Sequence, residues 1–310
     1  MFLLNYKMNK PKLYVGAEGS TWWKYGTLNP LFLAAFPDYE IILDLENRHP
    51  NLIIRTFDAK EEVSNVPYIC WSGECYPVPY RKNGQLPLCE INVFNVKRPV
   101  PSIYLPYGLE LWYDKDRYLE KIALPDFDRP YILAYMASNS VCLRQLLFKK
   151  FKEVFKDNAH SLGRCQREIE LNKDWDSSGY ENNNKIFSKY KFVLAAENSD
   201  VDWYITEKFF QAYTSGAIPI FWGTHHIKEV FNPNCFIYVK DFPTIDHLIK
   251  RVEEINNDKN LYMKIATAPI YANGKRHPYF NYYPNSKTSK KNGDILRKIY
   301  DNYIKHKDFV

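Results

Sequence analysis

The sequence predicts an α/β protein of two domains, each built on a parallel sheet. Its 310 residues are enough for two domains of ordinary size. Short apolar runs bounded by polar or turn residues recur along the chain, and in the second half they alternate with segments of helical length. With 45% hydrophobic and 25% charged residues, the composition excludes a disordered chain.

The first part of the chain opens as strand, helix and strand. Apolar runs predict strands at residues 12–15, 39–45, 52–57, 67–71 and 89–94. Residues 28–36, between the first two runs, predict a helix that ends before Pro37.

A domain boundary is predicted near residue 127. Residues 124–130 combine two prolines with charged side chains, a composition typical of linkers. We therefore expect an N-terminal domain at residues 1–127 and a C-terminal domain at residues 128–285. A basic tail follows at residues 286–310, with a helix from about Gly293.

The second part shows a regular alternation of strands and helices. Strands are predicted at residues 131–135, 191–195, 217–222 and 235–239, and helices near residues 141–155, 206–215 and 245–255, with a further short helix between the strands 217–222 and 235–239. This alternation indicates a parallel sheet with helices on both faces. Ligands of such sheets bind at the carboxyl ends of the strands.

Charge and cysteine content narrow the function classes. The net charge of +6 favours an anionic ligand, but the chain lacks the concentrated basic stripe of nucleic-acid binders. Six cysteines without C-x-x-C pairs predict reduced, mostly buried thiols in a cytoplasmic protein, with neither a zinc cage nor a disulfide framework. The leading apolar run, Met1 to Leu4, is too short for a signal peptide or a membrane helix.

The most informative block begins with the apolar run at residues 190–196, which leads into a polar loop. The helix after this loop carries Thr206, Glu207 and Lys208 in its first turn. A helix N-terminus offers unpaired backbone N–H groups and a partial positive charge, which suit a diphosphate, and Lys208 adds a full charge. The Glu207 carboxylate can accept hydrogen bonds from sugar hydroxyls. One loop is therefore predicted to recognise phosphate and sugar together.

This block resembles the α-1,3-fucosyltransferases, glycosyltransferase family ten. The family signature is a strand ending in Glu-Asn, a short loop, Tyr-x-Thr-Glu-Lys and a Gly-x-x-Pro strand. The matching residues here are Glu197, Asn198, Tyr204 to Lys208, Gly216 to Pro219 and the downstream run 231–242. The resemblance extends to residues 137–144, which lead to Arg144, and to residues 71–74, which end in Glu74.

The resemblance implies a GT-B type fold, with two Rossmann-like domains facing across a cleft. It also implies inverting transfer of L-fucose from GDP-fucose to a hydroxyl of an N-acetylglucosamine- or glucose-containing glycan. Glu74 would be the catalytic base, and Glu207 would support developing charge on the donor sugar. The residues that would bind the donor are Arg144, Asn198, Tyr204, Thr206, Lys208 and Glu197. Arg144 and Lys208 would neutralise the diphosphate without a divalent metal or another cofactor.

Short acidic and histidine motifs keep a metal-dependent glycosyltransferase open as an alternative. Asp200-Val201-Asp202 and Asp174-Trp175-Asp176 both resemble the Asp-x-Asp motif that holds Mg²⁺ or Mn²⁺. Two matches in one chain show how unspecific the motif is, and we interpret both as loop carboxylates. His225 and His226 lie at a predicted helix start, where neighbouring side chains point about 100° apart, so we expect them not to converge on a metal.

Two further classes of protein remain as alternatives. A catalytically silent sugar-binding module would keep the nucleotide loop and lose the base, although Glu74 argues against it. A lipid-surface or nucleic-acid protein would use the basic tail, whose run Lys287 to Lys291 we interpret as solvated. If Glu74 is not the base, Glu90 and Glu18 are the reserve candidates.

Overall fold

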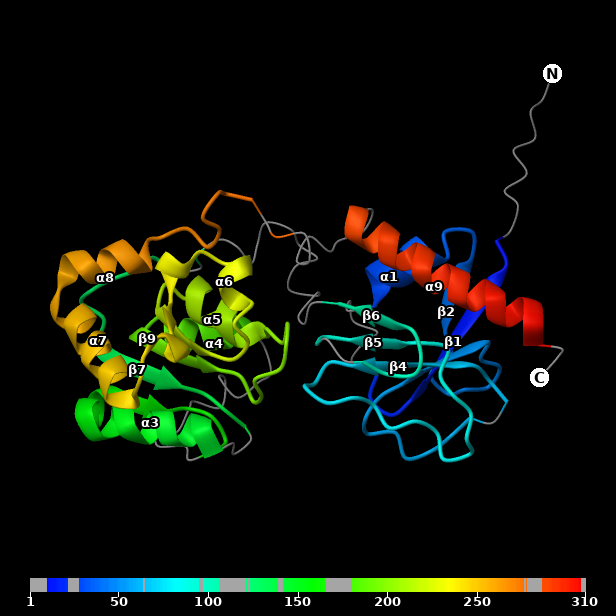
Figure 1. Cartoon of the computed structure of the whole chain (residues 1–310), viewed down its shortest axis with the longest axis horizontal. Coiled ribbons are helices and arrows are strands. Elements are labelled where there is room, and N and C mark those ends of the chain that lie inside the picture. The colour runs from blue at the N-terminus through cyan, green and yellow to red at the C-terminus, as the bar shows by residue number, and fades with distance from the viewer. Residues whose placement is uncertain are drawn as a thin grey trace, which may run out of the picture. The chain divides into compact units, whose positions relative to one another are not determined.

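The computed structural model describes residues 10–21, 28–63, 65–94, 97–105, 121, 123–138, 142–165, 180–275, 277 and 286–307. It divides into two compact units (Figure 1). The first contains the described residues up to 105 together with 286–307, and the second contains those from 121 to 277. Each unit is an α/β domain around a parallel sheet, as the sequence predicts.

The sheet of the first unit has six strands in the order β2-β1-β3-β4-β5-β6, and all its pairs are parallel. The strands are β1 (Lys12–Glu18), β2 (Glu40–Leu43), β3 (Leu52–Arg55), β4 (Tyr68–Ser72), β5 (Glu90–Asn92) and β6 (Ser102–Tyr104). Every residue of β3 is buried, as expected for an inner strand covered on both faces. The short strand β6 is not predicted from the sequence.

Two helices from opposite ends of the chain pack together in the first unit. Helix α1 (Asn29–Ala35) confirms the helix expected before Pro37, and α9 (Lys287–His306) packs on it (Figure 1). Helix α9 begins at the N-cap residue Ser286, whose side chain accepts the backbone N–H of Ser289, and so earlier than the predicted start at Gly293. The residues expected to form a separate tail therefore belong to the first unit, because α9 buries an apolar face that includes Leu296.

The second sheet has five parallel strands in the order β11-β10-β9-β7-β8. They are β7 (Tyr131–Tyr135), β8 (Ala159–Ser161), β9 (Tyr190–Ala196), β10 (Ile218–Trp222) and β11 (Ile237–Tyr238). The four strands predicted in this region are confirmed. Strand β8 is not predicted from the sequence, because its short sequence, Ala-His-Ser, is not an apolar run.

Helices cover both faces of the second sheet (Figure 1). Helices α3 (Cys142–Phe155), α7 (Ile245–Asn257) and α8 (Lys259–Ala266) pack on one face. Helices α4 (Tyr180–Phe187), α5 (Glu207–Thr214) and α6 (Ile227–Val230) pack on the other. Helices α8 and α4 are not predicted from the sequence, and the Asn-rich run of α4 has low helix propensity and is held by packing.

The structure also bears on the state of the cysteines and on whether any helix could span a membrane. The five cysteines whose side chains are described are free thiols, and Cys70, Cys89 and Cys235 are buried. The interpretation as mostly buried, reduced thiols holds for these residues. Across the described part of the chain, the helices are too short or too polar to span a bilayer.

Candidate active site

The strand order of the second sheet reverses between β7 and β9. From β7 the chain adds β8 on one side of the sheet and then continues with β9 on the other. At such a reversal the loops after the two strands diverge and leave a crevice in which ligands bind. Arg144, in the first turn of α3, follows β7, and Glu197 and Asn198 follow β9. Predicted donor residues therefore come from the loops that flank the reversal.

Glu197 is a fully buried carboxylate directly after β9. Its Oε1 accepts the backbone N–H of Thr206 at 2.7 Å, and the Thr206 hydroxyl lies 2.9 Å from Oε1 and 2.8 Å from Oε2. Thr206 occupies the N-cap position of α5, yet its hydroxyl bonds to this carboxylate instead of to the helix backbone. Glu197 therefore fixes the start of α5.

Lys208 connects two carboxylates. Its Nζ lies 3.2 Å from Glu197 Oε2 and 3.1 Å from Glu207 Oε1, and it donates to Thr206 Oγ1 at 2.9 Å. Burial alone would lower the pKa of Lys208, but the two carboxylates outweigh burial and raise that pKa, so the ammonium stays charged. Burial raises the pKa of Glu197, and Lys208 opposes this rise without cancelling it. The charge of Lys208 is thus shared between two carboxylates before any ligand binds.

Glu207 is only partly satisfied in this cluster. Its Oε1 accepts a hydrogen bond from Lys208, whereas its buried Oε2 has no hydrogen-bond partner among the described residues. Leaving a buried acceptor without a donor costs about 1–3 kcal/mol. The hydroxyl group of a ligand would supply the missing donor.

The remaining predicted donor residues differ in exposure. Arg144 is 3% exposed and Tyr204 is 2% exposed, while Asn198 is partly exposed. The Tyr204 side chain offers almost no surface to a ligand in this conformation, and its contact with the nucleotide stays a prediction.

Glu74, the predicted base, lies two residues beyond β4 in the first unit. Its backbone N–H donates to Ser72 Oγ at 3.3 Å, and the Ser72 hydroxyl lies 3.1 Å from the Glu74 carbonyl oxygen. A Cβ at Gly73 would lie 2.7 Å from the Trp71 indole, so glycine permits this tight turn. Glu74 is partly exposed.

The two reserve candidates for the base are held in buried ion pairs. Glu18 accepts from Arg55 Nη1 at 2.6 Å and from Arg81 Nη2 at 2.5 Å. Glu90 accepts from Arg98 Nε at 2.9 Å. Both carboxylates are almost inaccessible to solvent. Neither is suited to take a proton from an incoming hydroxyl group.

The two carboxylates of the Asp200–Asp202 motif contact different partners. Asp200 is ion-paired with Lys240, whereas Asp202 Oδ1 lies 3.8 Å from His226 Nε2. This arrangement favours their interpretation as separate loop carboxylates over a joint Mg²⁺ site. The second Asp-x-Asp match, Asp174 and Asp176, lies outside the described residues.

The expectation that His225 and His226 diverge is wrong. Their ring centroids are 4.0 Å apart, and together with Asp202 they offer three potential ligand atoms within 4.8 Å of one another. Helix α6 begins only at Ile227, so helical spacing does not govern the two histidines. The sequence holds a signal for this cluster: Asp202 follows one predicted strand and the histidines follow the next, and carboxyl ends of neighbouring parallel strands share an edge.

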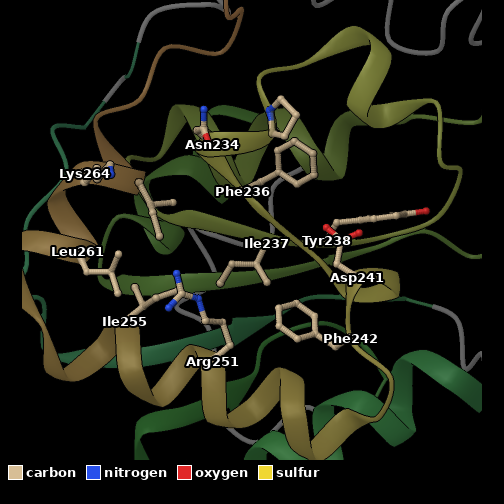
Figure 2. A pocket seen from close by; sticks show the side chains of 12 residues that line it. Asn234, Phe236, Ile237, Tyr238, Asp241, Phe242, Arg251, Ile255, Leu261 and Lys264 are labelled. Carbon is tan, nitrogen blue, oxygen red and sulfur yellow. The ribbon is translucent and has the colours of Figure 1, made fainter.

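A separate cavity of about 250 Å³ lies beside the edge strand β11 (Figure 2). Leu261 and Lys264 of α8 and Arg251 of α7 line it, together with Phe236 and Asp241. None of the predicted donor residues belongs to its lining, and the sheet reversal lies on the other side of β9 and β10.

Comparison with known proteins identifies relatives of the second unit. Residues 129–267 match the model of glycosyltransferase family 10 (fucosyltransferase), C-terminal region. The α-(1,3)-fucosyltransferase of Helicobacter pylori is 40% identical over 83 residues, which are 27% of this chain and 17% of that protein. The α-(1,3)-fucosyltransferase B of Drosophila melanogaster is 32% identical over 179 residues, 53% of this chain and 38% of that protein. The chain thus spans well under half the length of these two relatives.

A solved structure resembles the chain over nearly its whole length. The crystal structure of an α1,3-fucosyltransferase with GDP-fucose has a TM-score of 0.68 and 20% sequence identity, and the match covers 94% of this chain and 91% of that one. The likeness confirms the predicted GT-B fold class of two parallel-sheet α/β domains.

Proposed function

We propose that this chain, whose residues 129–267 match the model of glycosyltransferase family 10, belongs to that family and transfers L-fucose from GDP-fucose to a glycan. The acceptor we propose is a hydroxyl group of an N-acetylglucosamine- or glucose-containing glycan, and the transfer inverts the anomeric configuration. The relatives named as fucosyltransferases support the reaction class, and the relative solved with GDP-fucose supports the donor.

The observation that carries this proposal is the charge pattern beside the sheet reversal of the second unit. Arg144 and Lys208 bring two cations to the loops that flank the reversal, and Glu207 Oε2 lacks a hydrogen-bond donor. A nucleotide sugar supplies both partners, because its diphosphate is anionic and its sugar and ribose carry hydroxyl groups.

In this proposal each residue has a separate task. Arg144 and Lys208 neutralise the diphosphate of the donor without a divalent metal, and Asn198 and Tyr204 line the nucleotide site. Glu197 is fully buried and already bonded to Thr206 and Lys208, so it acts as a positioning residue and not as a direct ligand of the donor. Glu207 accepts a hydrogen bond from a donor hydroxyl.

The chemical step is a single displacement at the anomeric carbon. The oxygen of the acceptor hydroxyl attacks the anomeric carbon on the face opposite GDP, and Glu74 takes the proton of that hydroxyl as it attacks. The bond between the sugar and the diphosphate breaks, and its electron pair leaves with GDP. Arg144 and Lys208 stabilise this leaving charge, and the Glu207 carboxylate stabilises positive charge that develops on the sugar ring.

Product analysis tests the transfer directly. The protein is incubated with GDP-fucose and with Gal-GlcNAc, GlcNAc and glucose acceptors, and products are examined by mass spectrometry and NMR. We expect one acceptor to gain fucose with an anomeric configuration opposite to that of the donor. Binding of GDP-fucose with no transfer to any acceptor would instead favour a sugar-binding module, and retention of configuration would exclude the proposed displacement.

A nucleotide panel tests the donor site independently of the acceptor. GDP, UDP and CDP are compared by thermal shift, and we expect GDP to stabilise the protein most. A ligand at a hundred times its Kd stabilises the folded state by about 2.7 kcal/mol. Equal stabilisation by all three nucleotides would remove the guanine preference from the proposal.

We also propose a cytoplasmic location. Its support is that the cysteines with described side chains are free thiols, which persist in a reducing compartment. Cell fractionation followed by thiol labelling in the native protein tests this, and a disulfide-bonded, exported product would contradict it.

A further inference from the structure

Asp202, His225 and His226 form a cluster, here called the histidine cluster, that the proposed transfer does not use. Each residue offers one potential ligand atom, and the three atoms lie within 4.8 Å of one another. Asp202 belongs to the loop after β9, and the two histidines belong to the loop after β10. Because β9 and β10 are adjacent and parallel, both loops leave the sheet at the same edge.

The orientation of His226 suits metal binding. Its Nδ1 lies 2.7 Å from Glu229 Oε1, and its Nε2 lies 3.8 Å from Asp202 Oδ1. When a carboxylate accepts the N–H of one ring nitrogen, the other nitrogen carries the lone pair that binds a metal. Glu229 therefore fixes the imidazole with Nε2 directed at Asp202.

Two contacts hold the loops of the histidine cluster together. The Thr224 hydroxyl lies 3.3 Å from the backbone N of Trp203 and 3.4 Å from that of His226, so one side chain accepts from both loops. The Trp203 ring stacks on His226, with centroids 4.1 Å apart and ring planes 10° apart. These contacts limit the movement of His226 before any ion binds.

We propose that Asp202, His225 and His226 bind a divalent transition-metal ion of the zinc class and that this ion joins the two loops. Two imidazoles and one carboxylate match the donors that Zn²⁺ takes, with water in the fourth position of a tetrahedral site. Mg²⁺ and Ca²⁺ prefer oxygen ligands throughout and fit this cluster poorly.

Binding requires a small closure of the cluster. Ligand atoms about 2.0–2.1 Å from a tetrahedral zinc lie about 3.4 Å from one another, closer than the present limit of 4.8 Å. Asp202 and His225 are exposed, so their side chains are able to rotate inward toward the fixed ring of His226. The ion would bridge the loop that leads into α5 and the loop that leads into α6.

Zinc binding is measured on metal-stripped protein without a histidine tag and without nucleotide, so the test does not depend on the proposed transferase activity. Zn²⁺ is titrated in competition with a chromophoric chelator, and Co²⁺ serves as a spectroscopic probe of geometry. We expect one equivalent of Zn²⁺ to bind and a tetrahedral Co²⁺ spectrum. Asp202→Asn and His226→Ala should each weaken binding by at least about tenfold.

Matched variants separate the histidine cluster from other metal-binding groups. His49→Ala removes an exposed histidine of the first unit, and Cys165→Ser removes a partly exposed thiol of the second; neither should alter Zn²⁺ affinity. Glu229→Ala should weaken binding by about 10–100-fold, while Glu229→Gln keeps an acceptor for the His226 ring and should recover most of the affinity.

Hydrogen exchange tests whether the ion joins the loops. Addition of Zn²⁺ should slow exchange of backbone amides in both residues 198–206 and residues 223–227, and His226→Ala should abolish the effect in both segments. The melting temperature of each metal-free variant establishes that it is folded. Unchanged Zn²⁺ affinity in Asp202→Asn and His226→Ala would overturn the proposal, as would protection of only one loop or binding that requires GDP.

Discussion

The two sheets reverse their strand order in the same way, but the residues at the two reversals differ. In the first sheet β1 and β3 flank the reversal, and Glu18 and Arg55 are register partners at their carboxyl ends. Arg55 and Arg81 both contact Glu18, and Arg55 Nη2 also lies 3.9 Å from Glu62, so two cations face two carboxylates. Backbone N–H and C=O groups satisfy further atoms of this cluster, for example the Val63 N–H at 2.7 Å from Glu18.

The cluster beside the reversal of the second sheet is less complete. Lys208 is one cation between the carboxylates of Glu197 and Glu207, and one Glu207 oxygen is buried without a partner among the described residues. A fully paired cluster has no hydrogen-bonding capacity left, whereas an incompletely paired one can still accept a hydrogen bond from a ligand. The shared topology therefore places polar side chains at both reversals, and the pairing of these side chains decides whether a reversal is structural or binds a ligand.

The largest expected effect is on turnover, and it comes from Glu74, a carboxylate of the first unit that lies outside the buried cluster of Glu18. Glu74→Gln keeps the size of the side chain but cannot accept a proton, so turnover should fall by roughly two to four decades while GDP affinity stays the same. Steady-state kinetics and calorimetry on one folded preparation measure both. Glu46→Gln, at a side chain 71% exposed, is the matched control and should leave turnover unaltered. Turnover near the wild-type value in Glu74→Gln would remove the base from this position.

The same change from glutamate to glutamine at Glu18, inside the buried cluster, should lower the stability of the folded protein. Glu18→Gln leaves two buried arginines short of their carboxylate, and breaking such a buried pair costs about 3–5 kcal/mol of unfolding free energy. Chemical denaturation measures the loss, and GDP affinity of the folded fraction should be unchanged. A large drop in GDP affinity without a loss of stability would contradict the structural role of this cluster.

Lys208→Ala tests the incompletely paired cluster. A charge-assisted contact to phosphate is worth roughly 1.5–3 kcal/mol, so GDP affinity should fall by about one to two decades, together with turnover. Lys250→Ala, on the exposed face of α7, is the matched control. Isothermal titration calorimetry with GDP decides the outcome, and an unchanged affinity would take Lys208 out of the donor site.

Glu197→Gln should change how stability depends on pH. The pKa of Glu197 is raised in the folded protein, mainly by burial. At pH values between the ordinary pKa and the raised one, the folded state therefore binds more protons than the unfolded chain. Stability contributed by this group therefore decreases as pH rises through that interval. The Gln variant should lose this dependence, which melting temperatures measured from pH 4.5 to 7.5 would reveal. Parallel pH profiles for the two proteins would argue against a raised pKa.

The smallest effect is expected from divalent metals on donor binding. Because Arg144 and Lys208 are proposed to neutralise the diphosphate, GDP affinity in EDTA and in Mg²⁺ or Mn²⁺ should agree within about twofold. Calorimetry in the three buffers measures this. A strong requirement for Mn²⁺ would return the metal-dependent alternative, even though Asp200 and Asp202 contact different partners.

Most strands and helices of the fold, and part of the candidate site, can be predicted from the sequence. Strong apolar runs such as residues 218–222, and the block from Glu197 to Lys208, are recognised from residues that are neighbours along the chain. The features that the sequence does not predict depend on contacts between residues far apart along the chain. Strand β8 has no apolar pattern of its own and pairs with β7. Convergence of His225 with Asp202 arises only when the loops after β9 and β10 meet at one edge of the sheet.

Helix α9 has a consequence for the order in which the protein is made. It packs on α1 so closely that a Cβ at Gly293 would lie 2.7 Å from the Cβ of Ala34, and Tyr300 meets Phe36 with ring centroids 5.2 Å apart. Every residue of the second unit leaves the ribosome before α9 does. The second unit is therefore able to fold during translation, while the first must wait for α9 before it can bury the face of α1. A nascent chain that stalls just before residue 286 would hold a folded second unit beside an incomplete first one, which is the species that chaperones would meet.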